Sequence, residues 1–175
     1  MELEENSVLT LREVLDRIQR ENRAAKRTKR ELSHDLANRF IHTLKPWVHV
    51  VERPLGNANY FCIEIDSITL AVTSFCSHEE WWEKPSKGFR ELVARKHCKW
   101  GVVLFNLPKN EGLWIEGSAF DEKVLKGREK VNSSVVREAR RNHVGHVFSE
   151  SKEFIEIIRH PPKTPGKPYL VPKRA

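Results

Sequence analysis

The chain has 175 residues, a hydrophobic fraction of 39% and a charged fraction of 31%, which together predict one soluble globular domain with a sizeable core. Its formal net charge of +7 favours anionic partners such as nucleic acid or an acidic protein surface. No apolar run approaches the roughly 18 residues of a membrane span, the N-terminus lacks the pattern of a secretory signal, and three cysteines are too few for a disulfide framework. We therefore expect a cytoplasmic (intracellular) protein with reduced thiols and no membrane contact.

Residues 1–45 are expected to form an N-terminal helical region. A capping box at Thr10 and Glu13 marks a helix start. The apolar face that follows contains Leu11, Val14, Leu15 and Ile18. A second apolar stripe, before Pro46, contains Leu32, Leu36, Phe40, Ile41 and Leu44. Between the two stripes, residues 17–30 form a basic segment that either continues the helix or breaks it near residue 30.

Residues 46–160 change to strand-like patterns and predict a mixed α/β core, with a central mixed sheet of about four to six strands flanked by helices. The expected strands are Trp47–Glu52, Tyr60–Asp66, Ile68–Phe75, Gly101–Leu107 and Leu113–Glu116. Helices are expected at Phe89–Lys96, 129–142 and 151–159. Residues 161–175 are expected to form a basic, Pro-rich, extended tail. The N-terminal region either packs on the sheet or projects as a basic arm.

The helix expected over residues 129–142 gathers its cations on one side. At 100° per residue one narrow stripe contains Lys130, Ser134, Arg137 and Arg141. The opposite, apolar side contains Val131, Val135 and Ala139. A row of cations neutralises phosphates, and arginine adds bidentate hydrogen bonds, although a solvated helix face is the alternative. Candidate residues for contacting DNA or RNA come from the basic segment and from this helix. In the basic segment they are Arg23, Arg27 and Arg30, and in the helix they are Lys130, Arg137 and Arg141.

Two carboxylates suggest a different function. Glu64 and Asp66 are two positions apart on an expected strand, so their side chains should share one face. With a further acid such as Glu116 or Asp121, they could hold Mg²⁺ and direct a water at a phosphodiester, as a metal-dependent nuclease does. A solvated strand face is the alternative, and no other cofactor is indicated.

The order of elements resembles that of the restriction-endonuclease-like nucleases. That family carries an acid on one strand and an acid-x-Lys triplet on the next, which makes Asp121 and Lys123 candidate catalytic residues beside Glu64 and Asp66. Here the strand after Asp66 contains neither acid nor lysine, and the triplet lies far downstream at an expected helix start. The chain is therefore not assigned to that family.

Two Cys–His pairs contain the ligand types that zinc prefers. They are Cys76 with His78, and His97 with Cys98. Adjacent residues converge poorly on one ion, so the spacing favours small core residues, and we expect no metal site. The His143-x-x-His146 spacing suits a metal or a phosphate, but the glycine within it indicates a turn.

Trp81 and Trp82 are adjacent in a polar setting, so they cannot easily face the same core. We expect one of them to cover the core, and the other is a candidate anchor for a protein partner or a stacking platform for a base. Gly-rich phosphate loops and Gly-x-Ser-x-Gly elbows are missing, which disfavours P-loop, Rossmann and covalent hydrolase chemistry. Three classes remain: a nucleic-acid-binding protein, a nuclease, or a subunit of a larger phage or nucleoprotein assembly.

Overall fold

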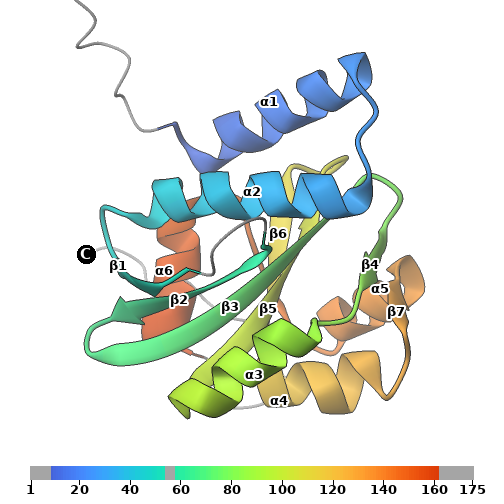
Figure 1. Ribbon diagram of the computed structural model, residues 1–175. Helices are drawn as coiled ribbons and strands as arrows, with labels where there is room; N and C mark the ends of the chain where they lie inside the picture. The colour runs from blue at the N-terminus through green and yellow to red at the C-terminus, as the bar shows by residue number, and fades with distance from the viewer. Residues whose placement is uncertain (1–8, 54–57, 162–175) are drawn as a thin grey trace, which may run out of the picture.

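The computed structural model describes residues 9–53 and 58–161 (Figure 1). A six-stranded mixed sheet of order β1-β2-β3-β5-β6-β8 forms the centre, helices cover both of its faces, and a two-stranded sheet, β4-β7, lies beside it. The mixed α/β architecture with a central sheet, predicted from the sequence, is confirmed.

The strands of the central sheet are β1 (His49–Glu52), β2 (Tyr60–Ile65), β3 (Ile68–Ser77), β5 (Lys99–Asn106), β6 (Glu111–Glu116) and β8 (His146–Phe148). The small sheet contains β4 (Trp81–Glu83) and β7 (Lys130–Asn132). The helices are α1 (Leu11–Ala24), α2 (Lys29–Leu44), α3 (Lys87–Lys96), α4 (Gly117–Ala119), the π-helical η1 (Phe120–Leu125), α5 (Ser133–Arg141) and α6 (Ser151–Arg159). Only β3 and β5 pair in parallel, and the other neighbours pair antiparallel.

The N-terminal helices pack on the sheet and do not project as an arm. The apolar residues predicted for the faces of α1 and α2 are all buried in one core cluster, together with Phe154 and Ile155 of α6 and Ile63 and Ile65 of β2. In Figure 1, α1 and α2 lie above the sheet, whereas α3 and α4 lie below it. The opposite face of the sheet carries a second cluster built from η1, α5 and Trp82.

Several predicted boundaries are wrong because short strands leave no readable period. The strand expected to begin at Trp47 begins at His49, and Asp66 belongs to the β2–β3 turn. The expected helix over 129–142 is divided into strand β7 and helix α5. Strands β4, β7 and β8 have three residues each, too few for an alternation to be recognised.

Within residues 9–53 and 58–161, no helix has the length and the apolar composition that crossing a bilayer requires. The expected tail, residues 161–175, lies outside the described part of the chain except for Pro161.

Candidate functional site

The basic segment bends where α1 meets α2. The side chain of Thr28 caps α2 by accepting a hydrogen bond of 3.2 Å from the backbone N–H of Glu31. Ala25, at the end of α1, has an extended backbone with φ −138°. The sequence contains the signal for this break, since Thr28-x-x-Glu31 repeats the capping box of Thr10 and Glu13. The prediction placed the break near residue 30, and it lies at residues 25–28.

Ion pairs fasten the bend. Arg27 donates to Asp35 at 2.7 Å, and Arg39 donates to the same carboxyl group at 2.9 Å and to Glu21 at 2.7 Å. Burial by itself would raise the pKa of Asp35, but the hydrogen bonds from Arg27 and Arg39 outweigh it and lower that pKa. Arg27, a candidate nucleic-acid contact, therefore also holds α1 against α2.

Helix α1 is also tied to the ends of the sheet strands. Gln19 donates from its side chain to the carbonyl of Leu107, which follows β5. The side-chain amide of Asn22 lies 2.5 Å from Nε2 of His78, which follows β3. Burial is the main cause that lowers the pKa of His78, so this imidazole is neutral at pH 7.

An open groove of 830 Å³ lies between the α1–α2 bend and the carboxyl end of β3. Its charged lining residues are Arg23, Lys26, Arg27, Lys29 and Glu79. We call this hollow the basic groove. Within the described part of the chain, Arg23 and Lys26 have no ion-pair partner, whereas Glu79 lies 3.3 Å from the ammonium group of Lys29. The groove therefore presents unneutralised positive charge.

Trp81 lies beside the basic groove and lines a neighbouring hollow that shares Lys29 with it. The ammonium group of Lys29 lies 2.6 Å from the centroid of the Trp81 ring, and that of Lys130 lies 4.5 Å from it. The indole N–H of Trp81 donates to Glu79 at 3.0 Å. Because Lys29 already covers one face of the ring, a base cannot stack on that face. The role of Trp81 in contacting a protein partner stays a prediction.

Trp82 confirms the expectation that one of the adjacent indoles covers the core. Its side chain is 2% exposed, and its indole N–H donates to the carbonyl of Phe105 at 3.1 Å.

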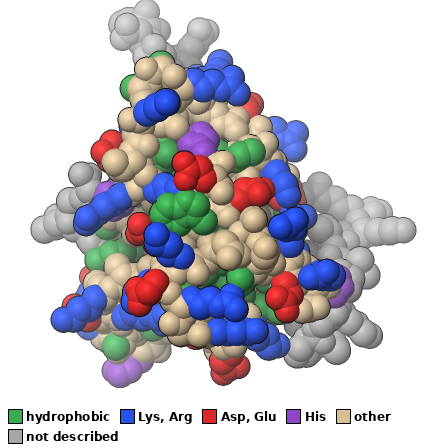
Figure 2. Space-filling view, turned by 90° about the vertical axis from the view of Figure 1, so that its right-hand side faces the viewer, with side chains coloured by type: hydrophobic (Ala, Val, Ile, Leu, Met, Phe, Trp, Pro, Cys, Tyr) green, Lys and Arg blue, Asp and Glu red, His purple; other side chains and the backbone are tan. Residues whose placement is uncertain are grey.

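Figure 2 views the face that carries the α1–α2 bend, β4 and β7, and Lys and Arg side chains are spread over much of it, with smaller areas of Asp and Glu between them.

The single helical stripe predicted for Lys130, Arg137 and Arg141 is wrong. Lys130 belongs to strand β7, where it pairs with Glu83 of β4, and its side chain extends to Trp81. Arg137 and Arg141 are exposed on α5, one turn apart, as predicted. Arg30, which is also exposed, is the second residue of α2 and lines a hollow of 430 Å³ that shares Lys29 with the basic groove. The tertiary structure thus brings Lys130 to the basic N-terminal segment.

The predicted pairing of Glu64 and Asp66 on one face is also wrong. Glu64 lies on β2, on the face opposite Ile63 and Ile65. Asp66 has a positive φ of 49° in the turn, and its carboxylate accepts a hydrogen bond of 2.9 Å from Arg159 of α6. Because α6 packs on the Ile63 side of the sheet, the two carboxylates point to opposite layers.

The downstream candidates have other partners. Asp121 accepts two hydrogen bonds, of 2.8 and 2.9 Å, from the guanidinium of Arg90. Glu116 accepts from the backbone N–H groups and the hydroxyl at the start of α4. Lys123 is exposed on η1 and lines a cavity whose lining residues do not include Glu64. Among residues 9–53 and 58–161, no three His, Cys, Asp or Glu side chains are grouped to hold a metal ion.

The two Cys–His pairs lie at opposite ends of the sheet. Cys76 and His78 lie at the carboxyl end of β3, and His97 and Cys98 precede the amino end of β5. The two strands are parallel and Cys76 pairs with Phe105, so Cys98 lies about 23 Å from Cys76 at roughly 3.3 Å per residue. One ion cannot reach both pairs.

Comparisons with family models, with curated proteins and with solved structures give no match.

Proposed function

We propose that the protein binds the phosphate backbone of nucleic acid, DNA or RNA, in the basic groove. The observation that carries the proposal is the lining of the groove, where four Lys and Arg side chains face a single carboxylate that is already paired with Lys29. Cations that lack internal partners gain from phosphate contact through release of the counterions around the nucleic acid.

The groove residues divide into two roles. Arg23 and Lys26 are exposed and have no ion-pair partner in the described part of the chain, so they are free to turn toward a phosphate. Arg27 and Lys29 are held in place, Arg27 by Asp35 and Lys29 by Glu79 and Trp81. The held pair gives the groove a fixed wall whose cations already have carboxylate partners, and the free pair supplies the unpaired positive charge and adaptable contacts. Since His78 is neutral at pH 7, the charge of the groove does not depend on histidine protonation.

Arg30 and Lys130 extend the proposed interface past Trp81. Arg30 follows Lys29 in the first turn of α2, and Lys130 reaches Trp81 from β7. Arg137 and Arg141 form a separate exposed pair on α5, which we propose as a secondary backbone contact. Contacts of this kind carry no base information, so the proposed binding is insensitive to sequence. An intracellular location goes with this proposal, because the three free thiols are reduced there.

The test compares two triple variants of equal net charge. The first is Arg23→Ala, Lys26→Ala and Arg30→Ala in one chain, all of which leave the ion pairs of Arg27 and Lys29 intact. The control replaces three exposed lysines elsewhere, which are Lys45, Lys87 and Lys152. Fluorescence anisotropy with labelled single- and double-stranded DNA and RNA, at two salt concentrations, measures affinity and its salt dependence.

The groove variant should bind every nucleic acid more weakly, and each lost phosphate contact should flatten the slope of log affinity against log salt by roughly 0.7 to 0.9. The control variant should keep most of the wild-type affinity, and both variants should melt like the wild type. If the folded groove variant and the control bind equally well, the basic groove is not the interface. If the wild type binds none of the four nucleic acids, the proposed function is wrong.

A further inference from the structure

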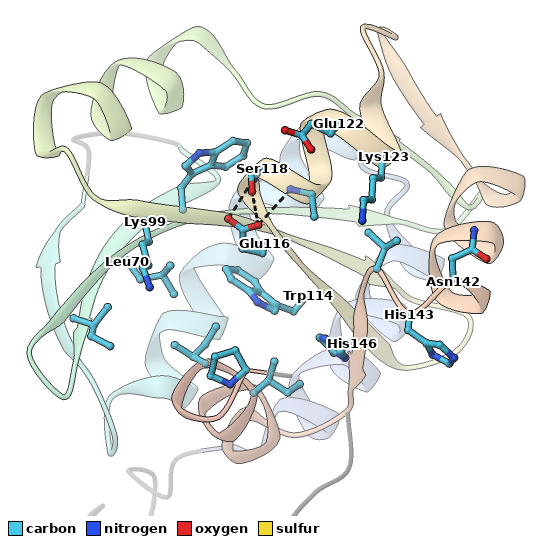
Figure 3. A pocket seen from close by; sticks show the side chains of 17 residues that line it. Leu70, Lys99, Trp114, Glu116, Ser118, Glu122, Lys123, Asn142, His143 and His146 are labelled. Carbon is cyan, nitrogen blue, oxygen red and sulfur yellow. Dashed lines mark hydrogen bonds between the residues drawn. The ribbon is translucent and has the colours of Figure 1, made fainter. Parts of the chain in front are cut away.

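A second hollow lies at the opposite end of the central sheet from the basic groove (Figure 3). The basic groove lies beside His78 at the carboxyl end of β3, and the second hollow lies beside Ile68 and Leu70 at its amino end. Eight residues of strand separate Leu70 from His78, which is about 25 Å at roughly 3.3 Å per residue. We call the second hollow the sheet-end cavity. Its volume of 430 Å³ lies within the range of roughly 300 to 1,000 Å³ that is usual for small-molecule sites.

Apolar side chains from three elements form the inner wall of the sheet-end cavity. They are Leu70 of β3, Trp114 of β6 and Ile157 of α6, each between 4% and 6% exposed. The six-membered ring of the Trp114 indole lies against Gly101, where a Cβ atom would stand 2.1 Å from the ring. Glycine at position 101 is therefore necessary for this position of the Trp114 ring. The wall is a fixed surface that can cover one side of an apolar molecule.

Unpaired positive charge stands at the rim. Lys99 begins β5 and Lys123 lies on η1, and both are exposed. Within the described residues, neither side chain has an ion pair or a hydrogen bond. Figure 3 shows Lys123 extending from η1 toward the middle of the cavity. Each ammonium group is a strong hydrogen-bond donor without an acceptor.

Glu116 and Glu122 also line the cavity, but in the described part of the chain neither carboxylate forms an ion pair with Lys99 or Lys123. Glu116 is already used, since its carboxylate accepts hydrogen bonds from the hydroxyl of Ser118 at 2.7 Å and from the N–H groups of Ser118 and Ala119 (Figure 3). Burial, followed by the charge of His143, lowers the pKa of His146, so its imidazole is neutral at pH 7. Glu122 is exposed on η1 and lines the outer part of the cavity, on the far side of Ser118 from Trp114 in Figure 3.

We propose that the sheet-end cavity binds a small organic anion with an apolar, ring-containing body. The body packs against Trp114, Leu70 and Ile157, and the carboxylate or phosphate of the ligand accepts hydrogen bonds from Lys99 or Lys123. A cationic ligand of the same shape meets two ammonium groups, and a neutral one leaves both of them without an acceptor. This site does not depend on nucleic-acid binding in the basic groove.

The test uses the full chain and the fluorescence of 8-anilinonaphthalene-1-sulfonate, which is itself an aromatic anion. Four competitors with one ring system then displace it: 1-naphthoate, 1-naphthyl phosphate, 1-naphthalenemethanol and 1-naphthylmethylamine. Both anions should displace the probe at concentrations at least about tenfold lower than the alcohol and the amine, as charge-assisted hydrogen bonds predict. The stronger of the two anions identifies the natural head group as a carboxylate or a phosphate.

Three variants locate the binding. Ile158→Trp enlarges a partly buried side chain that lines the cavity, and it should lower the affinity for the probe at least about tenfold. Lys99→Ala with Lys123→Ala should leave the alcohol unaffected and remove the preference for the anions. The control, Lys87→Ala with Lys152→Ala, has the same net charge and should behave as the wild type.

Thermal melting must show each variant folded, because the probe also binds loosened apolar cores. If Ile158→Trp does not fold, the lysine pair and its control still decide the assignment. Equal displacement by all four competitors, or an anion preference that survives in the folded double lysine variant, would overturn the proposal.

Discussion

The carboxylate of Asp66 accepts a hydrogen bond of 2.9 Å from Nε of Arg159, which joins the β2–β3 turn to the last turn of α6. Asp66 has a φ of 49°, so the alternation of β2 ends at Ile65 and the Asp66 side chain turns toward the layer of α6. Glu64 remains on the other face of the sheet. Asp66, which the sequence pattern suggests as a metal ligand, is thus part of a structural ion pair with Arg159.

Asp66→Asn should lower the free energy of unfolding by at most about 1 kcal/mol, because the pair is exposed, with 60% of the Asp66 side chain accessible. Urea denaturation measures this change, and Arg159→Gln should have a similar effect.

The same variants test the nuclease hypothesis. Any cleavage of DNA or RNA that the protein shows with Mg²⁺ or Mn²⁺ should persist in Asp66→Asn and in Glu64→Gln, since the two carboxylates face different layers. Loss of a metal-dependent cleavage in both folded variants, with EDTA abolishing it in the wild type, would restore the catalytic role.

Trp82 and Trp81 should differ in their contribution to stability. Trp82→Ala should cost about 3 to 5 kcal/mol, because it empties a buried site, and Trp82→Phe should cost about 1 kcal/mol through the lost hydrogen bond to Phe105. Trp81→Ala should cost only about 1 kcal/mol, since that ring is partly exposed and mainly contacts Lys29 and Lys130. Chemical denaturation of the three variants provides the comparison, and equal losses for Trp81→Ala and Trp82→Ala would contradict the assignment.

Glu52 should contribute to the acid sensitivity of the fold. Hydrogen bonds from Arg95, followed by Lys96, lower the pKa of Glu52 from 4.5 to about 2. A carboxyl group with a lowered folded-state pKa stabilises the protein fully above its unfolded-state pKa, and this stabilisation disappears as the pH falls through the folded-state value. The stability difference between the wild type and Glu52→Gln should therefore be constant above pH 5 and shrink between about pH 4.5 and pH 2.

Denaturation at pH 7, 5, 4 and 3 checks this window. Arg95→Gln should reduce the pH dependence of Glu52, because it removes the first of the two donors. A stability difference that stays the same from pH 7 to pH 3 would show that Glu52 is not held by these cations.

Purified protein should contain no stoichiometric zinc. Cys76 and Cys98 are separated along the sheet, and burial raises the pKa of the Cys76 thiol, which opposes the thiolate that zinc requires. Elemental analysis of protein prepared without chelator measures the metal content. About one zinc per chain, lost in Cys76→Ser, would show that the cysteine is a ligand.

The sequence by itself determined the parts of this fold that local rules govern. The start of α1 follows from hydrogen bonding between Thr10 and Glu13, three residues apart, and the buried faces of α1 and α2 follow from apolar spacing of three and four. The strands β2 and β3 were recognisable from alternation over six to ten residues, and β5 from a continuous apolar run that is typical of a strand buried on both faces.

Only the tertiary structure decided which charged residues meet. Lys130 was predicted to be helical because its spacing from Arg137 fits a helix. It is a strand residue because it pairs with Glu83, 47 positions earlier, and its side chain extends to Trp81. Asp66 became a partner of Arg159, 93 positions later, through a turn that one positive φ sets. Such pairings join segments that are remote in sequence. They stabilise the protein only after the core has brought those segments together, so local sequence patterns do not predict them.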